Sequence, residues 1–142
     1  MSGATIPDDK HELLKQQHFG MLTTVRADGL LSTNPVGFYF DGETVRISTL
    51  KSRVKYRNIQ ADSRVCFCVQ SFKNPMDYIE IRGHATVADD SDSAFLKMQF
   101  ASGSGGAEPP EDMDPPSAER VVITLHPEQV SAPQLYGGRF DK

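Results

Sequence analysis

Two Asp-Gly pairs, Asp28-Gly29 and Asp41-Gly42, each stand between short segments rich in apolar residues. Glycine adopts positive φ without steric cost, so Asp-Gly in this setting is a strong signal for a tight β-hairpin turn. The two turns predict three consecutive antiparallel strands, over residues 19–26, 32–40 and 44–50. A chain that opens with such a meander is expected to be mainly β.

The rest of the chain continues this pattern and adds a few helices. Ile79 and Ile81 alternate with polar residues, Gly83 marks a bend or bulge, and Pro127 is expected to end the last strand. The other predicted strands cover 64–70, 77–88 and 120–126, and the predicted helices cover 8–17, 52–61 and 91–100. Six strands without a βαβ rhythm favour a closed or split antiparallel barrel with helices packed on it, since a small open sheet would expose long edges.

The chain of 142 residues fits a single domain over 1–142 with a real core. Residues 101–117 are rich in Gly, Pro and acidic side chains, and we expect a flexible loop or lid there. The tail 131–142 is polar and is expected either to dock on a partner or to stay loose.

Several function classes are disfavoured by composition. No apolar run approaches the roughly 20 residues that a membrane span needs, so no membrane role is expected. Residues 1–10 lack the apolar stretch of a secretory signal, which makes the cytoplasm the expected location. A net charge of −4 argues against a general nucleic-acid binder, because phosphate neutralisation needs a broad basic surface.

The two cysteines, Cys66 and Cys68, would share one face of a strand, where two small buried apolar side chains are the expected reading. Their spacing argues against a disulfide. The four histidines are scattered at 11, 18, 84 and 126, without metal-ligand spacing. No metal site is therefore predicted.

Positive charge is concentrated where the third strand passes into the next helix. Lys51, Arg53, Lys55 and Arg57 fall within seven residues of an otherwise acidic chain, and Ser52 is a plausible N-cap for the helix. Unbonded N–H groups and the helix dipole also favour an anion at a helix start, with phosphate the usual occupant. The competing interpretation is a solvated basic helix face, and Arg57 is expected to support the structure rather than a ligand.

Four blocks of sequence occur in an order that resembles a known family. They are Thr-Thr-Val-Arg-Ala-Asp-Gly at 23–29, Asn-Pro-Val at 34–36, Ser-Thr-Leu-Lys-Ser-Arg-Val-Lys-Tyr-Arg-Asn at 48–58 and Asp-Ser-Arg-Val at 62–65. In this order they resemble the pyridoxamine 5′-phosphate oxidase-like, FMN-binding split-barrel family. Within it they are most similar to the actinobacterial flavin/deazaflavin oxidoreductases that use coenzyme F420. The resemblance covers most of residues 13–130.

The resemblance implies a homodimer with a cofactor site at each subunit interface. Arg53 and Lys55 would grip the cofactor phosphate, with Arg suited to bidentate contact and Lys acting as a point charge. Lys51 would assist with a negatively charged tail. The other implied cofactor-binding residues are Ser48, Thr49 and Leu50 along the ribityl-phosphate arm, Asn34, Pro35 and Val36 beside the ring, and Met76 and Tyr78 contributed by the other subunit.

Two positions depart from the family pattern. Many relatives carry Trp where this chain has Gly37, and the loss should widen the ring pocket or remove a stacking surface. Relatives often carry Gly where this chain has Ser52, which could cap the helix or loosen the grip on phosphate.

The implied function is hydride transfer from reduced F420 to an unsaturated organic acceptor, with a proton from solvent or from a hydroxyl such as Tyr78. The catalytic residues are not identified, since no Ser-His-Asp or paired-carboxylate arrangement is evident. The alternatives are an FMN-dependent oxidoreductase of the same fold, a non-catalytic F420 or flavin carrier, and a protein that binds another anion such as haem propionates or an acidic peptide. Four cations exceed what one phosphate needs, which favours F420 over FMN.

Overall fold

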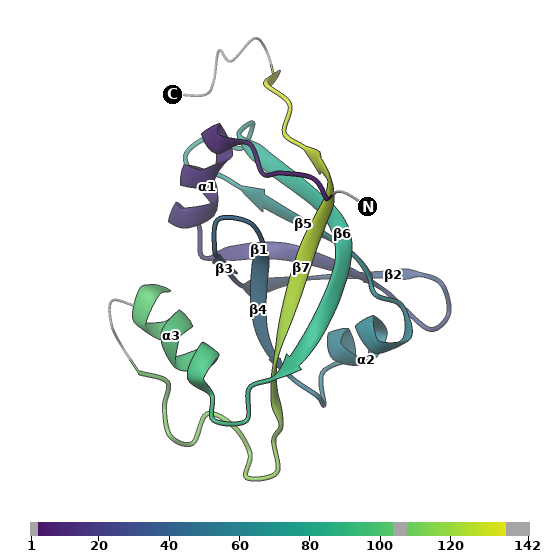
Figure 1. The fold of residues 1–142 in the computed structure, drawn as a ribbon, viewed down its shortest axis with the longest axis vertical. Coiled ribbons are helices and arrows are strands. Elements are labelled where there is room, and N and C mark those ends of the chain that lie inside the picture. The colour runs from purple at the N-terminus through teal and green to yellow at the C-terminus, as the bar shows by residue number, and fades with distance from the viewer. Residues whose placement is uncertain (1–2, 104–107, 136–142) are drawn as a thin grey trace.

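The computed structural model describes residues 3–103 and 108–135. Its strands form one antiparallel sheet in the order β2-β1-β5-β6-β7-β4-β3 (Figure 1). The elements in chain order are η1 (Asp8–Lys10), α1 (His11–Gln16), β1 (Phe19–Val25), β2 (Leu31–Gly37), β3 (Tyr39–Phe40), β4 (Val45–Leu50), α2 (Val54–Ala61), β5 (Arg64–Gln70), β6 (Tyr78–Asp89), α3 (Ala94–Gly103) and β7 (Arg120–Ser131). The mainly β, antiparallel split-barrel expectation is confirmed, with seven strands instead of six.

The two outermost strands of the sheet are neighbours in the chain. β2 ends at Gly37 and β3 begins at Tyr39, so only Phe38 separates strands that lie at opposite edges. The sheet must therefore curl until its edges nearly meet, as Figure 1 shows. The prediction of one strand over 32–40 is wrong in this respect. Phe38 turns into the core and packs edge-on against Phe67, with ring centroids 5.0 Å apart, which breaks the strand.

Both predicted hairpin turns are present. Gly29 and Gly42 have φ of 84° and 100°, values that L side chains rarely adopt. Each preceding aspartate accepts backbone N–H bonds within its turn: Asp28 Oδ1 from Leu30 at 3.0 Å, and Asp41 Oδ1 from residue 44 at 2.7 Å. Local sequence chemistry alone therefore determines these two reversals.

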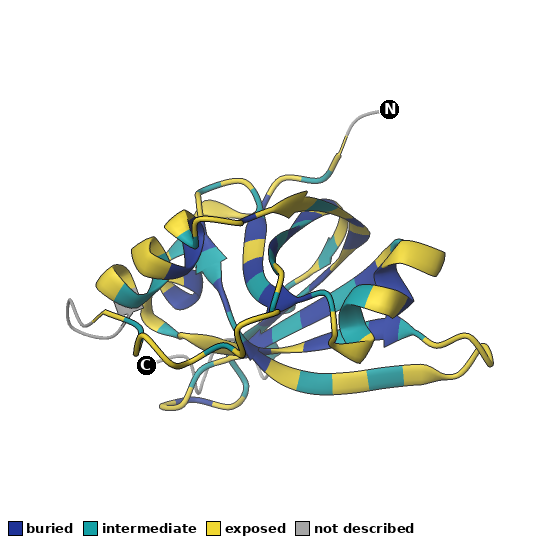
Figure 2. Cartoon of the chain, turned by 90° about the horizontal axis from the view of Figure 1, so that it is seen from below, coloured by how far each residue is buried: buried dark blue, intermediate teal, exposed yellow. Residues whose placement is uncertain are grey.

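The interior of the curled sheet is filled by one side of each long strand. Figure 2 shows buried and exposed residues alternating along the strands, as the period of two predicted. Phe67 lies at the centre, and a Cβ at Gly20 would come within 2.3 Å of its ring. The fully buried positions include Leu22, Val45, Val69, Ile79, Ile81, Val121, Ile123 and Leu125.

The last strand does not end at Pro127, contrary to prediction, and β7 continues to Ser131. The pairing of β6 with β7 shifts register between Arg82 and Gly83, and Gly83 lies opposite Pro127. A β-bulge is one of the few places where a strand accepts proline, which has no N–H to donate. A Cβ at Gly83 would lie 2.0 Å from the carbonyl oxygen of His126, so only glycine fits there. The predicted bend at Gly83 is confirmed.

The helices follow the predicted ranges but differ in detail. Arg53 occupies the N-cap position of α2 without a side-chain cap, so the prediction of Ser52 as N-cap is wrong. Val54, the first residue of α2, is 49% exposed. Ile59 is buried, and Asn58 donates to Thr24 Oγ1 at 3.0 Å, which ties α2 to β1. A buried hydrogen bond from a side-chain amide thus joins the apolar contact of Ile59 in holding α2 on the sheet.

The buried side chains of α3 lie at its start. Phe95 and Leu96 are buried, whereas Met98 is exposed. The buried Asp90 accepts bonds from the backbone N–H groups of Phe95 and Leu96, at 3.1 and 3.2 Å. This carboxylate orients the start of the helix. Of the segment predicted to be flexible, residues 101–103 instead belong to α3, residues 108–117 contain turns, and residues 104–107 lie outside the described residues, as does most of the tail, 136–142.

Cys66 and Cys68 share one face of β5, as predicted, and both thiols are free. They are half-buried, not fully buried, because they lie on the outer face of the sheet. Cys66 Sγ donates to Glu80 Oε2 at 3.3 Å. Burial, followed by this carboxylate, raises the pKa of the Cys66 thiol to about 11.

Candidate functional site

The basic segment forms a tight connection between β4 and α2. The Arg53 backbone N–H donates to the Leu50 carbonyl at 3.0 Å, which closes the turn. Arg57 donates from Nη1 to the Ser52 carbonyl at 3.0 Å and so supports the same turn from within the helix. This contact fits the expectation that Arg57 supports the structure.

The Lys51 side chain forms ion pairs within the chain. Its Nζ lies 3.3 Å from Glu119 Oε2 and 3.5 Å from Asp89 Oδ1, and its backbone N–H donates to the Glu119 carbonyl. These carboxylates, Glu119 first, raise the pKa of the Lys51 ammonium. Lys51 therefore ties the turn to the neighbouring ends of β6 and β7, and any role towards a ligand stays a prediction.

Arg53 and Lys55, unlike Lys51, have no acidic partner among the described residues. Within residues 3–103 and 108–135, neither side chain makes a hydrogen bond or an ion pair. Lys55 is half-buried, and its pKa is lowered by burial and then by the charge of Arg53. Two adjacent cations held without a carboxylate are a local cost to the fold, and such costs concentrate at functional sites.

This arrangement fits a cofactor that carries a phosphate. The first N–H groups of α2 are not capped by the Arg53 side chain, so they can donate to a bound anion. Arg53 is exposed and can reach such an anion, while Lys55 would regain the counter-charge that it lacks. Both residues were predicted for this role from the sequence.

The predicted residues on β4 and β2 differ in what they can offer. Thr49 and Leu50 are buried, so only their backbone groups are available to a ligand, whereas Ser48 is half-buried. On β2, Val36 points into the core. Asn34 is half-buried and Pro35 exposed on a strand that has a sheet neighbour, β1, on one side only within the described chain.

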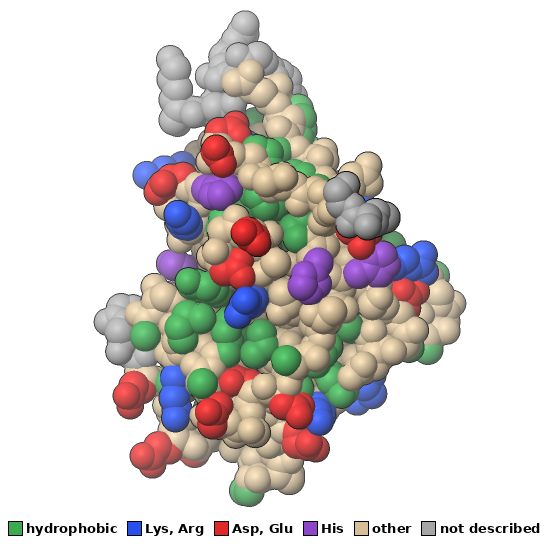
Figure 3. All heavy atoms as spheres, in the orientation of Figure 1, with side chains coloured by type: hydrophobic (Ala, Val, Ile, Leu, Met, Phe, Trp, Pro, Cys, Tyr) green, Lys and Arg blue, Asp and Glu red, His purple; other side chains and the backbone are tan. Residues whose placement is uncertain are grey.

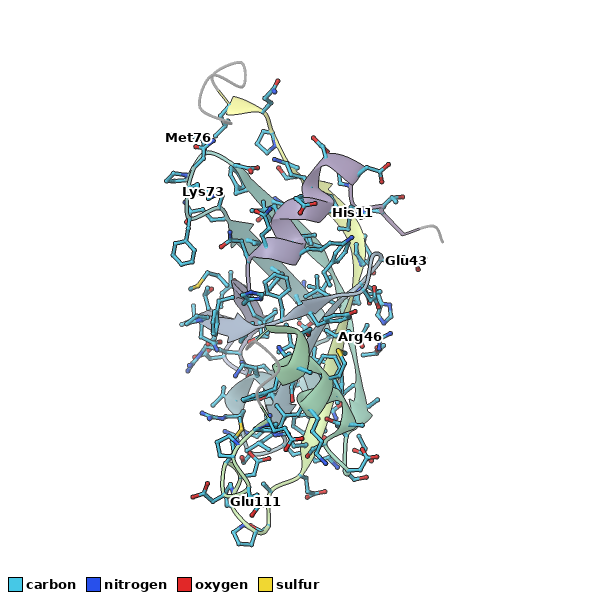
Figure 4. All side chains as sticks on the ribbon, turned by 90° about the vertical axis from the view of Figure 1, so that its left-hand side faces the viewer. His11, Glu43, Arg46, Lys73, Met76 and Glu111 are labelled. Atoms are coloured by element: carbon cyan, nitrogen blue, oxygen red, sulfur yellow. The ribbon has the colours of Figure 1, made fainter. Side chains whose placement is uncertain are left out.

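Met76 and Tyr78 lie far from the basic turn within one chain. They belong to the connection that leaves β5 at Gln70 and enters β6, whereas α2 enters β5 at Arg64. Seven residues of strand separate the two ends, about 20 Å at ~3.3 Å per residue. Figure 4 places Met76 near α1, and Lys10 Nζ bonds Asp77 at 2.5 Å in this region. Their contribution from a second subunit stays a prediction.

A cleft of about 520 Å³ lies between α1, α3 and the strands beside them. Figure 1 shows α1 and α3 on the same side of the sheet, and Figure 3 shows hydrophobic side chains gathered over this part of the surface. Of the residues that the sequence singled out, Gly37 and Ser48 line it. Sequence reasoning missed the other polar and aromatic walls, among them His18, Tyr39, Gln99, Phe100 and Arg120.

Arg120 is the most constrained polar group in this cleft. Its side chain is 10% exposed, its Nε and Nη2 each donate to Asp114 at 2.8 Å, and its Nη1 donates to Ser48 Oγ at 3.0 Å. The hydrogen bonds from Arg120 lower the pKa of the Asp114 carboxyl. No sequence signal marks this pair, because a proline-rich turn of unpredictable shape brings the two residues together.

A second, more open groove of about 760 Å³ crosses the outer face of β1, β5, β6 and β7. Its cations are neutralised locally: Arg64 pairs with Asp62 at 2.6 Å, and Arg82 pairs with Glu80 at 2.8 Å. His84 likewise bonds Glu128. The groove therefore lacks the uncompensated positive charge of the β4–α2 turn.

The described residues contain no group of three or more His, Cys, Asp or Glu side chains placed to hold a metal ion. No helix in the described ranges is long and apolar enough to cross a membrane.

Comparison with known proteins identifies the family. The family model described as pyridoxamine 5′-phosphate oxidase matches residues 6–132. The chain belongs to the pyridoxamine 5′-phosphate oxidase family. Among curated members, an F420H(2)-dependent biliverdin reductase of Mycobacterium tuberculosis (strain CDC 1551 / Oshkosh) is 31% identical over 126 residues, which cover 88% of this chain and 86% of that protein.

Solved structures of this family agree with the fold. One named as an F420 reductase is 35% identical with a TM-score of 0.78, covering 89% of this chain and 98% of the other. A pyridoxamine 5′-phosphate oxidase-type protein of Listeria innocua is 25% identical with a TM-score of 0.68, covering 88% and 95%. Membership in the oxidase family and the split-barrel fold are thus confirmed together.

Proposed function

We propose that this chain is an F420-dependent oxidoreductase that transfers a hydride from the reduced coenzyme to an unsaturated organic acceptor. Two relatives that are at least 30% identical carry names that refer to F420. The observation within the chain that carries the proposal is the pair Arg53 and Lys55, two cations without a counter-charge at the start of α2.

The charge of the turn favours F420 over FMN. One phosphate is satisfied by two cations and a helix start, which Arg53, Lys55 and α2 already provide. F420 adds a lactyl group and glutamate carboxylates beyond its phosphate. Lys51 lies two residues before Arg53 and could exchange its exposed carboxylate partners for such a tail. FMN remains the alternative cofactor.

The residues of this chain would hold the cofactor and the acceptor in position and would not act as acid or base themselves. Bound reduced F420 supplies a hydride, and a proton from solvent or a hydroxyl completes saturation of the acceptor's double bond. The edge strand β2 would place Asn34 and Pro35 beside the ring, and Arg53 and Lys55 would hold the phosphate end. Holding both partners in register is the larger part of what such a site contributes.

We also propose that the active unit is a homodimer, because an apolar face of the sheet is left uncovered. Phe19 and Met21 on β1 are 69% and 43% exposed, and Leu31 on β2 is 68% exposed. The register of β1 with β2 places these side chains on one face, with Cys68 alongside. A second copy would cover this face and could bring its Met76 and Tyr78 to the ring site.

Fluorescence titration of the purified protein with F420 and with FMN tests the cofactor assignment. We expect F420 to bind more tightly, and tighter FMN binding would overturn the preference.

Sedimentation equilibrium tests the dimer, with Met21→Asp expected to yield monomers. The comparison variant is Met98→Asp, since Met98 is 37% exposed and lies on α3 instead of on β1 or β2.

A non-catalytic F420 carrier is the second candidate, and the absence of a Trp side chain at Gly37 favours it. Stopped-flow oxidation of bound reduced F420 by a panel of enones and quinones separates the two. Turnover supports the enzyme, whereas binding without acceptor-dependent oxidation supports the carrier.

A further inference from the structure

The cleft between α1 and α3 has walls suited to a flat apolar molecule. Its lining includes the aromatic residues Tyr39 and Phe100 and the apolar residues Leu14, Leu96 and Met113. A volume of about 520 Å³ falls within the range of small-molecule sites. Aromatic side chains favour planar ligands because their faces and edges stack against other rings.

The polar part of the lining is one-sided. Lys15, His18, Gln99 and Arg120 contribute cations and N–H donors, and among the described residues no aspartate or glutamate lines the cleft. The carboxylate of Asp114, which contacts the lining residue Arg120, is already held by it through two hydrogen bonds. Such a lining attracts an anionic, acceptor-rich group and disfavours a cation.

Arg120 retains donors for a ligand. Arginine has five N–H donors, and three are engaged with Asp114 and Ser48. The bidentate pair with Asp114 and the bond to Ser48 hold the guanidinium in one orientation, so little side-chain entropy is lost when a ligand binds.

The cleft also adjoins the proposed cofactor path. Gly37 directly follows the Asn34–Val36 segment proposed to lie beside the ring, and Ser48 is common to the cleft and the predicted cofactor arm. A Cβ at Gly37 would lie 3.4 Å from Gln99 Nε2, so the missing side chain leaves room at the junction. The space that sequence reasoning expected from the loss of Trp is thus part of this cleft.

We propose that the α1–α3 cleft is the acceptor site, and that the acceptor is a planar, conjugated molecule bearing a carboxylate. This inference rests on the proposed function, because only a reductase has an acceptor. The binding of a planar carboxylate in the cleft does not depend on it. The carboxylate is held by the cationic side chains of the lining, and the conjugated system lies between the aromatic walls. A hydride and a proton then saturate one double bond of the acceptor while F420 is oxidised.

The test uses 9-anthracenecarboxylate and 9-anthracenemethanol, which share a planar fluorescent ring system and differ in charge. Each is titrated into the full-length protein without cofactor. We expect the carboxylate to bind at least ~10-fold more tightly, equivalent to about 1.4 kcal/mol. Gly37→Leu should weaken carboxylate binding at least ~10-fold by filling the cleft. Lys15→Gln should weaken the carboxylate ~3-fold and leave the alcohol unchanged.

Two control variants match these changes outside the cleft. Ala101→Leu introduces the same side chain at an exposed position of α3 that does not line the cleft, and Lys73→Gln removes one exposed lysine charge elsewhere. Both should keep carboxylate affinity within twofold of the parent. Equal affinity for the two probes, or undiminished binding by Gly37→Leu, would overturn the inference.

An F420 titration of the same proteins separates the two proposals. If F420 binds and the carboxylate does not, the cleft inference fails while the proposed function stands. If the carboxylate binds in a Gly37-dependent way and F420 does not, the cleft is a ligand site and the proposed function fails. Absence of both kinds of binding overturns both.

Discussion

Replacing Lys55 with glutamine should change anion binding and fold stability in opposite directions. The substitution keeps most of the side-chain length and removes a half-buried charge that has no carboxylate partner among the described residues. If Lys55 contacts the cofactor phosphate, a charge-assisted hydrogen bond worth about 1.5–3 kcal/mol is lost. The Kd for F420 should then rise roughly 10- to 150-fold.

Stability should move the other way because the folded chain disfavours the charged form of Lys55. Burial and Arg53 lower its pKa below 10.5, so the unfolded chain binds more protons between the lowered pKa and that value. The free energy of unfolding therefore rises with pH between these two pKa values. The cost of holding Lys55 charged in the folded chain is fully present at pH 7. Like charges close together on a helix cost about 0.2–0.5 kcal/mol, so Lys55→Gln should stabilise the free protein by about that much.

Fluorescence titration gives the Kd, and urea unfolding at pH 7 gives the free energy of unfolding. Lys97→Gln is the matched control, since Lys97 is an exposed lysine on α3. Its Kd for F420 should stay within twofold of the parent. A Kd for Lys55→Gln within twofold of the parent, or a loss of more than ~1 kcal/mol of stability, would refute the reasoning about this site.

Three further outcomes follow from the structure. Gly83→Ala should cost at least ~3 kcal/mol in urea unfolding, because its Cβ would meet a backbone carbonyl at 2.0 Å; a loss below ~1 kcal/mol would contradict the bulge geometry. Cys66, with a pKa of about 11, should react slowly with iodoacetamide at pH 8, and Glu80→Gln should speed the reaction; an unchanged rate would exclude the carboxylate's influence. Hydrogen bonds from Arg64 lower the pKa of Asp62 to about 2, so its favourable contribution is present above ~4 and lost as pH falls towards 2, which carboxyl NMR titration can follow; a midpoint near 3.8 would refute the pairing.

The elements that the sequence predicted well are those determined by neighbouring residues. Asp28-Gly29 and Asp41-Gly42 form their turns through local hydrogen bonds and positive φ, whatever surrounds them. The alternation in β6 and β7 and the concentration of cations at 51–57 are equally local. The position of the basic turn therefore follows from the sequence, whereas phosphate binding by Arg53 and Lys55 stays a prediction from the family resemblance.

Errors occurred where distant segments decide the outcome. The strand predicted over 32–40 is interrupted because Phe38 finds Phe67 in the core, and Pro127 stays within a strand because Gly83 lies opposite it. The sequence around Phe38 does not reveal Phe67 as its partner, and the sequence around Pro127 does not reveal Gly83. The same holds for Lys51, whose acidic partners come from the ends of β6 and β7.

The sequence alone determined the strand turns, the buried face of each strand and the place where positive charge gathers, since each depends on residues within a few positions. Only the tertiary structure decided which cations keep their charge uncompensated and where a cleft opens. Both depend on the curl of the sheet, which brings α1, β3 and α3 together and sets Arg120 against Asp114 and Ser48. Packing and electrostatic pairing act through space, and the spacing of residues along a chain does not specify them.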